Sequence, residues 1–242
     1  MNVIDRLKKT ILNSTPYDQH PIVIDECFLS SEEINDIKFK VFDLKHLWQY
    51  LGQKTEIENN LDVMLLPLGK YTRNNKDYSI DVNTLKHIMF ENFSTFYNRI
   101  KEEIEKIHKC EVNFLPYAHY PGFHIFHNSK NYICHYPFYR FHKDRFFFDS
   151  LHLGKIYSYI VPILLPSLPT GLAYCTKNLH SPINKNSLEK EHLTFYYKVG
   201  SLIRWDGNIL HSIKPFHLMP NESRITLQFH VSIGYDQNFL FW

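Results

Sequence analysis

The chain has 242 residues, with 27 lysines and arginines against 25 aspartates and glutamates, which gives a formal net charge of +2. Hydrophobic residues make up 44% and charged residues 21%, so the chain has enough apolar material for a core and too little charge for a disordered polymer. This near balance of charge offers no concentrated basic face, and we expect no nucleic-acid partner. The length predicts one sizeable domain.

The cysteines and the apolar runs bear on the cellular compartment. Four cysteines without a CxxC pair are too sparse for a disulfide-built secreted module. Charged residues interrupt the opening MNVIDRLKKTILN, where a signal peptide needs an apolar segment. The longest apolar run, residues 156–166, is shorter than the ~20 residues that cross a bilayer. We therefore expect a cytoplasmic protein without a membrane association.

The first elements in chain order are short strands and two amphipathic helices. Residues 21–25 predict a β-branched strand, and Ser30 with Glu33 has the spacing of a capping box that begins a helix. Residues 61–68 predict another strand, and about 82–108 a long second helix with an apolar stripe. Such stripes are typical of scaffold helices that pack against a larger body.

After residue 110 the sequence is rich in strand-forming residues separated by polar turns. The predicted strands cover residues 111–126, 132–142, 155–164, 171–175, 194–198, 201–205, 209–213 and 223–233. About eight short strands after two helices predict a mainly β fold with flanking helices, a jelly roll or barrel. We expect a single domain over 1–242, with strands and buttressing helices in 1–110, the β core in 111–234 and a tail in 235–242.

A candidate metal site lies in two of these strands. In FHKDRFF, His142 and Asp144 stand two residues apart, so their side chains share one face of a strand. His211, in DGNILHSIKPF, supplies a second imidazole just after a turn. Two histidines and one carboxylate are the ligand set of non-haem Fe(II) sites, which leave three positions open for O2 and a bidentate co-substrate.

A candidate anion site lies thirteen residues beyond His211. In SRITLQFHVSIG, Arg224 and Thr226 lie on the polar face of an alternating strand whose other face is apolar. A planar guanidinium suits a bidentate contact with a carboxylate, and the Thr226 hydroxyl adds one donor. His230, on the same face, is either a group supporting this site or a satisfied core histidine.

These residues together resemble the HxD…H…RxS/T signature of Fe(II)- and 2-oxoglutarate-dependent oxygenases. The opening PIVIDECFLSSEEI is similar to the strand-then-helix entry of the phytanoyl and prolyl hydroxylase branches. Most of the chain shares the resemblance, which is densest over residues 134–234. Arg224 departs from the lysine usual in the prolyl branch.

The resemblance implies a double-stranded β-helix, or cupin-like, core. Fe(II) would be held by His142, Asp144 and His211, and the distal carboxylate of the co-substrate 2-oxoglutarate by Arg224 and Thr226. The resemblance further implies that O2 is consumed and that 2-oxoglutarate is oxidatively decarboxylated to succinate and CO2. This reaction would drive the abstraction of hydrogen from a substrate. In related halogenases a small residue replaces the carboxylate ligand, so that chloride can bind the metal. Asp144 therefore favours hydroxylation, or another oxidation such as desaturation or ring closure, over halogenation.

Several further residues are weaker candidates. Tyr117 and His119 are expected to line a substrate pocket, and Arg140 or Arg145 to pair with an anionic substrate such as an amino acid, although a salt-bridged rim arginine is the simpler reading. A tyrosine from a neighbouring strand is expected to assist Arg224. The candidates for that role are Tyr132, Tyr136, Tyr157 and Tyr159. Residues 177–192 are expected to form either a mobile lid or an insertion without a role in the site.

Three functions fit these observations. The first is an oxygenase that hydroxylates a small metabolite, such as an amino acid or another carboxylate-bearing compound. The second is a cupin-like protein that binds a metal or small molecule without redox turnover, which has no need of Arg224. The third is a peptide or protein hydroxylase on the same fold, because a peptide groove leaves no fixed mark in the sequence.

Overall fold

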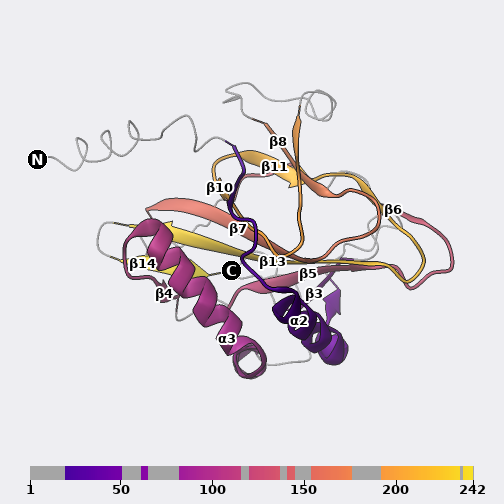
Figure 1. The fold of residues 1–242 in the computed structure, drawn as a ribbon, viewed down its shortest axis with the longest axis horizontal. Helices are drawn as coiled ribbons and strands as arrows, with labels where there is room; N and C mark the ends of the chain where they lie inside the picture. Colours follow the sequence, from indigo (N-terminus) through magenta and orange to yellow (C-terminus); the bar gives the residue numbers. More distant parts are fainter. Residues whose placement is uncertain are drawn as a thin grey trace, which may run out of the picture.

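The computed structural model describes residues 20–50, 61–64, 82–115, 120–136, 141–144, 154–175, 192–234 and 237–241. Within these ranges the chain is mainly β (Figure 1). The helices are α2 (Ser31–Asp43), the 3₁₀ helix η2 (Leu44–Leu47) and α3 (Val82–His108). The strands are β1 (Ile22–Asp25), β2 (Gln49–Tyr50), β3 (Leu61–Met64), β4 (Asn113–Phe114), β5 (Gly122–His127), β6 (Cys134–Tyr136), β7 (Lys155–Leu164), β8 (Gly171–Cys175), β9 (Leu193–Tyr196), β10 (Leu202–Asp206), β11 (Leu210–Ile213), β12 (Phe216–Leu218), β13 (Ser223–Ile233) and β14 (Asn238–Phe241).

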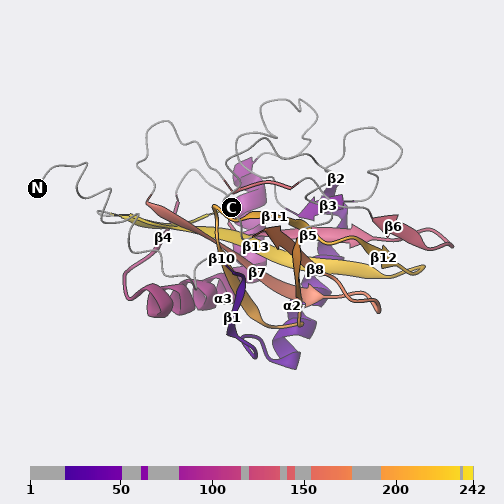
Figure 2. The same ribbon diagram turned by 90° about the horizontal axis from the view of Figure 1, so that it is seen from above.

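A nine-stranded sheet forms the body of the molecule. Its main path runs β1-β10-β7-β13-β5-β3-β2, and β14 pairs with β13 and with β4. The long strands β7 and β13 pair antiparallel over most of their length and lie side by side across the molecule (Figure 2). A second sheet has the order β11-β8-β9, and β6 pairs with β12. The sheet therefore joins strands from the beginning, the middle and the end of the described chain.

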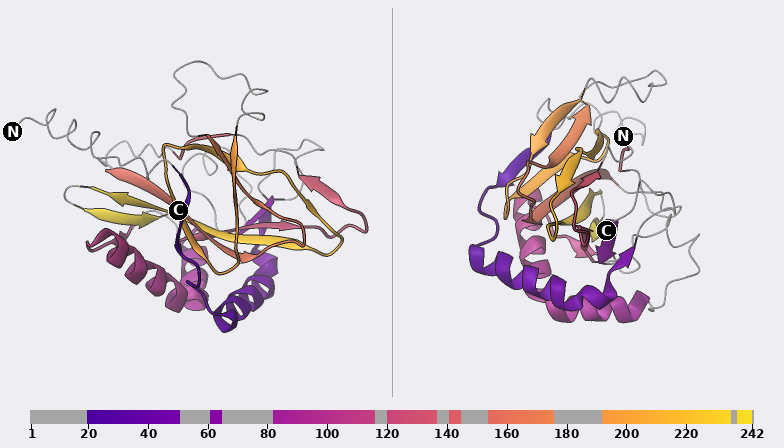
Figure 3. Two further views of the ribbon diagram at one scale, coloured as in Figure 1. Left: turned by 45° about the horizontal axis from the view of Figure 1, so that its top comes forward. Right: turned by 90° about the vertical axis from the view of Figure 1, so that its right-hand side faces the viewer.

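The two faces of β13 are buried against different layers. Its apolar residues, among them Ile225, Leu227 and Phe229, are fully buried in a core shared with both α-helices. Its polar residues lie on the opposite face, because side chains alternate along a strand. The helices cover the first face, and the β8–β9–β11 sheet lies across the second (Figure 3). The alternation in the sequence thus places a polar stripe between the two sheets.

The two helices form as the sequence predicts. Ser30 Oγ accepts the Glu33 backbone N–H, and the Glu33 side chain accepts the Ser30 N–H, which confirms the capping box. The apolar stripe that the sequence predicts for residues 82–108 is buried on α3. Arg99 on α3 forms an ion pair with Glu33 on α2 and so joins the two helices. In the described part of the chain, neither helix combines the length and apolarity that a membrane crossing requires.

Several strands differ from the prediction in their bounds. The run 111–126 is divided into β4 and β5, and the run 132–142 contains β6 and then a single bridge at His142. Strand β12 was not predicted from the sequence, and β14 lies in the stretch that was expected to be a C-terminal tail. Both β12 and β14 are short and are defined by their partners, β6 and β13, which a local pattern does not show.

Candidate metal centre

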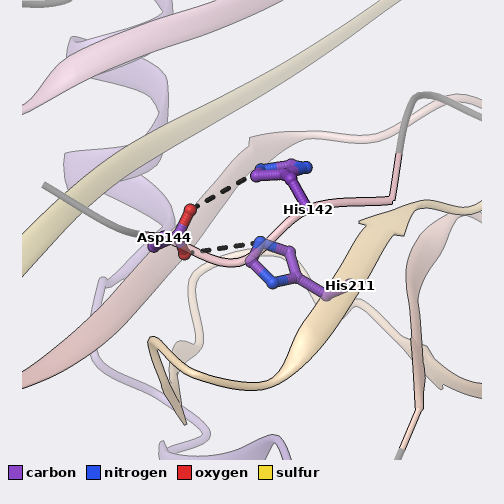
Figure 4. Close-up of side chains that lie close together, drawn as sticks. All are labelled: His142, Asp144 and His211. Carbon is purple, nitrogen blue, oxygen red and sulfur yellow. Dashed lines mark ion pairs between the residues drawn. The ribbon is translucent and has the colours of Figure 1, made fainter. Parts of the chain in front are cut away.

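The backbone brings His142, Asp144 and His211 together. His142 and His211 form a two-residue antiparallel bridge, in which each N–H donates to the other's carbonyl at 2.9 Å. The Asp144 N–H donates to the Gly207 carbonyl at 2.9 Å, in the turn before β11. The HKD segment is therefore fixed against the turn and strand that carry His211, and the three side chains converge (Figure 4).

The spacing of the three side chains suits a single ion. His142 Nε2 lies 3.5 Å from Asp144 Oδ1, and His211 Nε2 lies 3.4 Å from Asp144 Oδ2. One ligand atom from each residue lies within 4.8 Å of the others. Ligands ~2.1 Å from one ion lie about 3 Å apart when they are at right angles. Among the described residues no other group of three or more possible ligands is this close.

The protonation states also favour metal binding. The Nδ1–H of His211 donates to the Ile209 carbonyl at 2.9 Å, which leaves Nε2 as the nitrogen with a free lone pair. Burial lowers the pKa of His211, so the imidazole is neutral at neutral pH. Burial opposes ionisation of Asp144, but the imidazoles of His211, His230 and His142 and the Ser158 hydroxyl hold its pKa below the ordinary value. A neutral imidazole and a carboxylate are the forms that ligate metals.

The centre is accessible from one side. The His211 side chain is 6% exposed and that of Asp144 is 10% exposed, whereas that of His142 is 45% exposed. The indole of Trp205 packs edge-on against His211, with ring centroids 5.3 Å apart. Solvent or a substrate therefore reaches the centre on the His142 side.

Arg224 lies on the polar face of β13 in an aromatic enclosure. Its side chain is fully buried, and its guanidinium carbon lies 5.4–5.5 Å from the ring centroids of Phe126, Tyr197 and Phe216. Among the described residues, none gives a hydrogen-bond partner to Nε, Nη1 or Nη2 of Arg224, or to the Thr226 hydroxyl. An unpaired buried charge is costly, so an anion bound in this enclosure would stabilise the folded state.

Tyr197 is the one of the three aromatic residues around Arg224 that carries a hydroxyl. Burial lowers the pKa of Arg224, and Tyr197 offsets part of this effect. Their geometry nevertheless falls short of a hydrogen bond, because the Tyr197 hydroxyl also has no partner among the described residues. The hydroxyls of Thr226 and Tyr197 and the guanidinium of Arg224 are thus buried without forming hydrogen bonds to one another.

His124 links this enclosure to the three ligands. It stands opposite Thr226 in the pairing of β5 with β13, on the same face of the sheet. Burial lowers its pKa to about 3, and the charges of Arg224, His230 and His142 act in the same direction. The neutral His124 imidazole therefore lies within electrostatic reach of both Arg224 and the metal ligands.

The tyrosine facing Arg224 is Tyr197, which was not among the candidates. Tyr157 and Tyr159 alternate with Ser158, so they lie on the helix-facing side of β7, where Tyr159 stacks on Phe229. Tyr132 is 57% exposed. Tyr136 stacks on Phe216 and so is one ring away from Arg224. Tyr197 lies near the end of a predicted strand, and this position was the only sign in the sequence that it could reach Arg224. The sequence did not show which strand faces β13.

Ser158 is the other site residue that the sequence analysis missed. Its hydroxyl donates to Asp144 Oδ2 at 2.6 Å. It stands opposite His230 in the β7–β13 pairing, and only this register reveals its position. The substrate candidates Tyr117, His119, Arg140 and Arg145 lie outside the described residues, as do residues 177–191 of the suggested lid.

Comparisons with known proteins bear on the fold. No protein-family model matches the chain, and no curated protein matches it significantly. Among solved structures, the non-heme alpha-ketoglutarate-dependent epimerase SnoN from nogalamycin biosynthesis matches over 98% of both chains, with 10% identity and a TM-score of 0.56. The chain has the SnoN fold. HygX from Streptomyces hygroscopicus, solved with nickel and 2-oxoglutarate, has 10% identity and a TM-score of 0.49 over 98% of this chain and 89% of its own.

Proposed function

We propose that this protein is an Fe(II)- and 2-oxoglutarate-dependent oxygenase that acts on a small molecule. One observation carries the proposal: three ligand atoms converge within 4.8 Å, and the same inter-sheet layer holds a fully buried guanidinium with no partner among the described residues. A cupin-like protein that only holds a metal has no use for that guanidinium. The proposal therefore favours the enzyme over the binding protein.

The strand order supports a double-stranded β-helix built as one domain. The central strands of the large sheet run β10-β7-β13-β5, and the opposed sheet runs β9-β8-β11 with His142 bridged to β11. His211 thus lies in the smaller sheet and His142 is bridged to it, while Arg224 lies in the larger sheet. The SnoN likeness, which extends over nearly all of both chains, agrees with this arrangement.

The donor set fits Fe(II). His142, Asp144 and His211 would hold one face of an octahedral ion and leave the other three positions open. Bound iron with 2-oxoglutarate and O2 supplies the oxidising power that removes hydrogen from a substrate, with succinate and CO2 as the other products. The chain's own residues fix the ligands in position: the Ile209 carbonyl sets the His211 tautomer, and the Gly207 carbonyl anchors Asp144.

The buried anion site fits the distal carboxylate of 2-oxoglutarate. The Arg224 fork would donate two parallel hydrogen bonds to that carboxylate, and the Thr226 and Tyr197 hydroxyls would supply further donors. Three aromatic rings exclude water from the guanidinium, which strengthens a charged contact. The other end of the co-substrate would then supply the two oxygen ligands that the open positions of the metal accept.

The substrate we propose is a small metabolite such as an amino acid or another carboxylate-bearing compound. Arg140 or Arg145 would pair with its carboxylate, and Tyr117 and His119 would contribute to its pocket. Hydroxylation is the outcome that Asp144 favours, because the carboxylate occupies the position that a halide would need. SnoN is described as a non-heme alpha-ketoglutarate-dependent epimerase, so outcomes other than hydroxylation are also compatible with this fold.

A succinate-release assay tests the proposal. The wild-type protein, supplied with Fe(II) and air, is expected to form succinate from 2-oxoglutarate, most rapidly with its substrate among a panel of amino acids and small acids. Asp144→Ala should reduce this rate at least ~100-fold, while Asp36→Ala on the exposed face of α2 should leave it unchanged. Undiminished turnover by Asp144→Ala without added halide would contradict the assigned ligand.

A further inference from the structure

The Asp144 carboxylate ends a chain of hydrogen bonds that begins in the large sheet. Ser158 Oγ donates to Asp144 Oδ2 at 2.6 Å, and His230 Nδ1 lies 3.2 Å from the same Oγ. Ser158 on β7 stands directly opposite His230 on β13. Ser158 is fully buried and His230 is 9% exposed, so water competes little for either contact.

The hydrogen bonds in this series all point in one direction, from His230 through Ser158 to Asp144. Asp144 must be ionised to ligate a metal, and a carboxylate only accepts hydrogen bonds. Ser158 therefore uses its single O–H on Asp144 and can only accept from His230. It follows that His230 carries its proton on Nδ1. Two strands of the large sheet thus supply an aligned His230, Ser158, Asp144 sequence of donors.

This alignment restricts the Asp144 carboxylate. Turning its plane would break the short buried bond at Oδ2 and leave the Ser158 O–H without its acceptor, which is costly in a dry site. Asp144 sits in the HKD segment, where its main-chain anchor is one N–H bond to the turn before β11. Side-chain support from the opposite sheet is therefore what fixes the direction of the carboxylate.

We propose that Ser158 and His230 are positioning residues that hold Asp144 as a one-oxygen metal ligand, an inference that rests on the proposed function. A carboxylate free to turn would bind through both oxygens and occupy a fourth coordination position. That position is one of three that a bidentate co-substrate and O2 require. Ser158 and His230 therefore keep the ion open for the reaction. They also order the carboxylate before the metal binds, which removes that ordering cost from the binding free energy and raises the affinity for the ion.

Metal titration without turnover tests the role of Ser158. Co(II) binding to the metal-free protein is followed by calorimetry and by the visible absorption of the bound ion. Ser158→Ala should weaken Co(II) binding about 10- to 100-fold and change the spectrum at saturation. Ser158→Thr, which keeps the hydroxyl, should show the Co(II) affinity and the spectrum of the wild type. Ser201→Ala is the matched control, because Ser201 is equally buried but bonds to the Lys198 carbonyl.

Two substitutions at His230 separate its hydrogen bond from its volume. Asn places an amide N–H near the position of Nδ1, so His230→Asn should retain affinity within about threefold, whereas His230→Leu should lose it. The double variant with Ser158→Ala and His230→Leu should bind no more weakly than Ser158→Ala alone, because His230 acts through Ser158.

The outcomes distinguish this inference from the proposed function. If Ser158→Ala keeps the wild-type affinity and spectrum, or if Ser201→Ala changes both as strongly as Ser158→Ala does, the positioning role is wrong. If the wild-type protein binds no Co(II) at all, the proposed oxygenase centre itself is wrong.

Discussion

A single residue, Arg224, gives the clearest physical evidence of a ligand. It is the largest fully buried side chain among the described residues, and it has three aromatic rings around its charge instead of a carboxylate. Removing a charged group from water without pairing it destabilises the folded state. The protein retains this unfavourable arrangement, and a bound carboxylate would offset it.

Replacing Arg224 with Met should therefore have opposite effects on binding and on stability. Removal of the guanidinium should weaken anaerobic 2-oxoglutarate binding to the metal-loaded protein about 100-fold or more. It should also raise the unfolding temperature of the metal-free protein, because the unpaired buried charge is gone. Calorimetry and thermal denaturation measure the two effects.

Arg224→Lys is the control for charge, since it keeps the cation and loses the planar fork. Its affinity for 2-oxoglutarate should lie between those of the wild type and Arg224→Met. Equal 2-oxoglutarate affinity in all three proteins would favour a metal-binding protein without redox turnover.

At the scale of elements, the strands were predicted well where they are long and alternating. The predicted run 223–233 coincides with β13, and 155–164 coincides with β7. The predicted run 111–126 covers two strands in different parts of the sheet, because aromatic residues continue through the connection between them. Local composition therefore located the strands but not all of their ends.

The close approach of β8 to β9 provides an element-scale prediction. A Cβ at Gly171 would lie 2.1 Å from the Phe195 carbonyl oxygen, so Gly171→Ala must separate these strands. Because β8 also pairs with β11, which carries His211, the substitution should lower both thermal stability and Co(II) affinity. We expect the free energy of unfolding to fall by about 3 kcal/mol. Leu168→Ala, in the exposed turn before β8, should change neither property.

At the scale of the whole molecule, buried neutral histidines should make the metal-free protein sensitive to acid. Burial lowers the pKa of His108 to about 4, and Arg204 and Lys155 act in the same direction. Between pH 6.5 and about 4 the unfolded chain binds a proton on this imidazole and the folded chain does not. The histidine therefore favours folding above pH 6.5, and this contribution is lost as the pH falls toward 4.

Urea denaturation at pH 7.5 and at pH 5 measures this effect. One such histidine gives a slope of up to ~1.4 kcal/mol per pH unit in the unfolding free energy. His108→Gln, which removes an imidazole on α3 that is not one of the metal ligands, should reduce the slope. An unchanged slope in that variant would show that His108 is not buried in its neutral form.

The candidate site was predicted only in part from the sequence. The i, i+2 spacing of His142 and Asp144 pointed to the metal ligands only in combination with the distal His211, the Arg224–Thr226 pair and the family resemblance. It did not identify Ser158 or Tyr197, whose neighbours in the site are more than a dozen residues away in the chain. The four substrate candidates stay predictions, since they lie outside the described residues.

The sequence by itself determined the alternation of β13, the two helical stripes and the types of side chain available to bind a metal and an anion. These are local properties, fixed by the periods of helix and strand. Only the tertiary structure decided which strands lie opposite one another, and so which hydroxyl supports Asp144 and which phenol faces Arg224. Strand pairing joins residues far apart in the chain, and its register depends on the packing of the whole molecule.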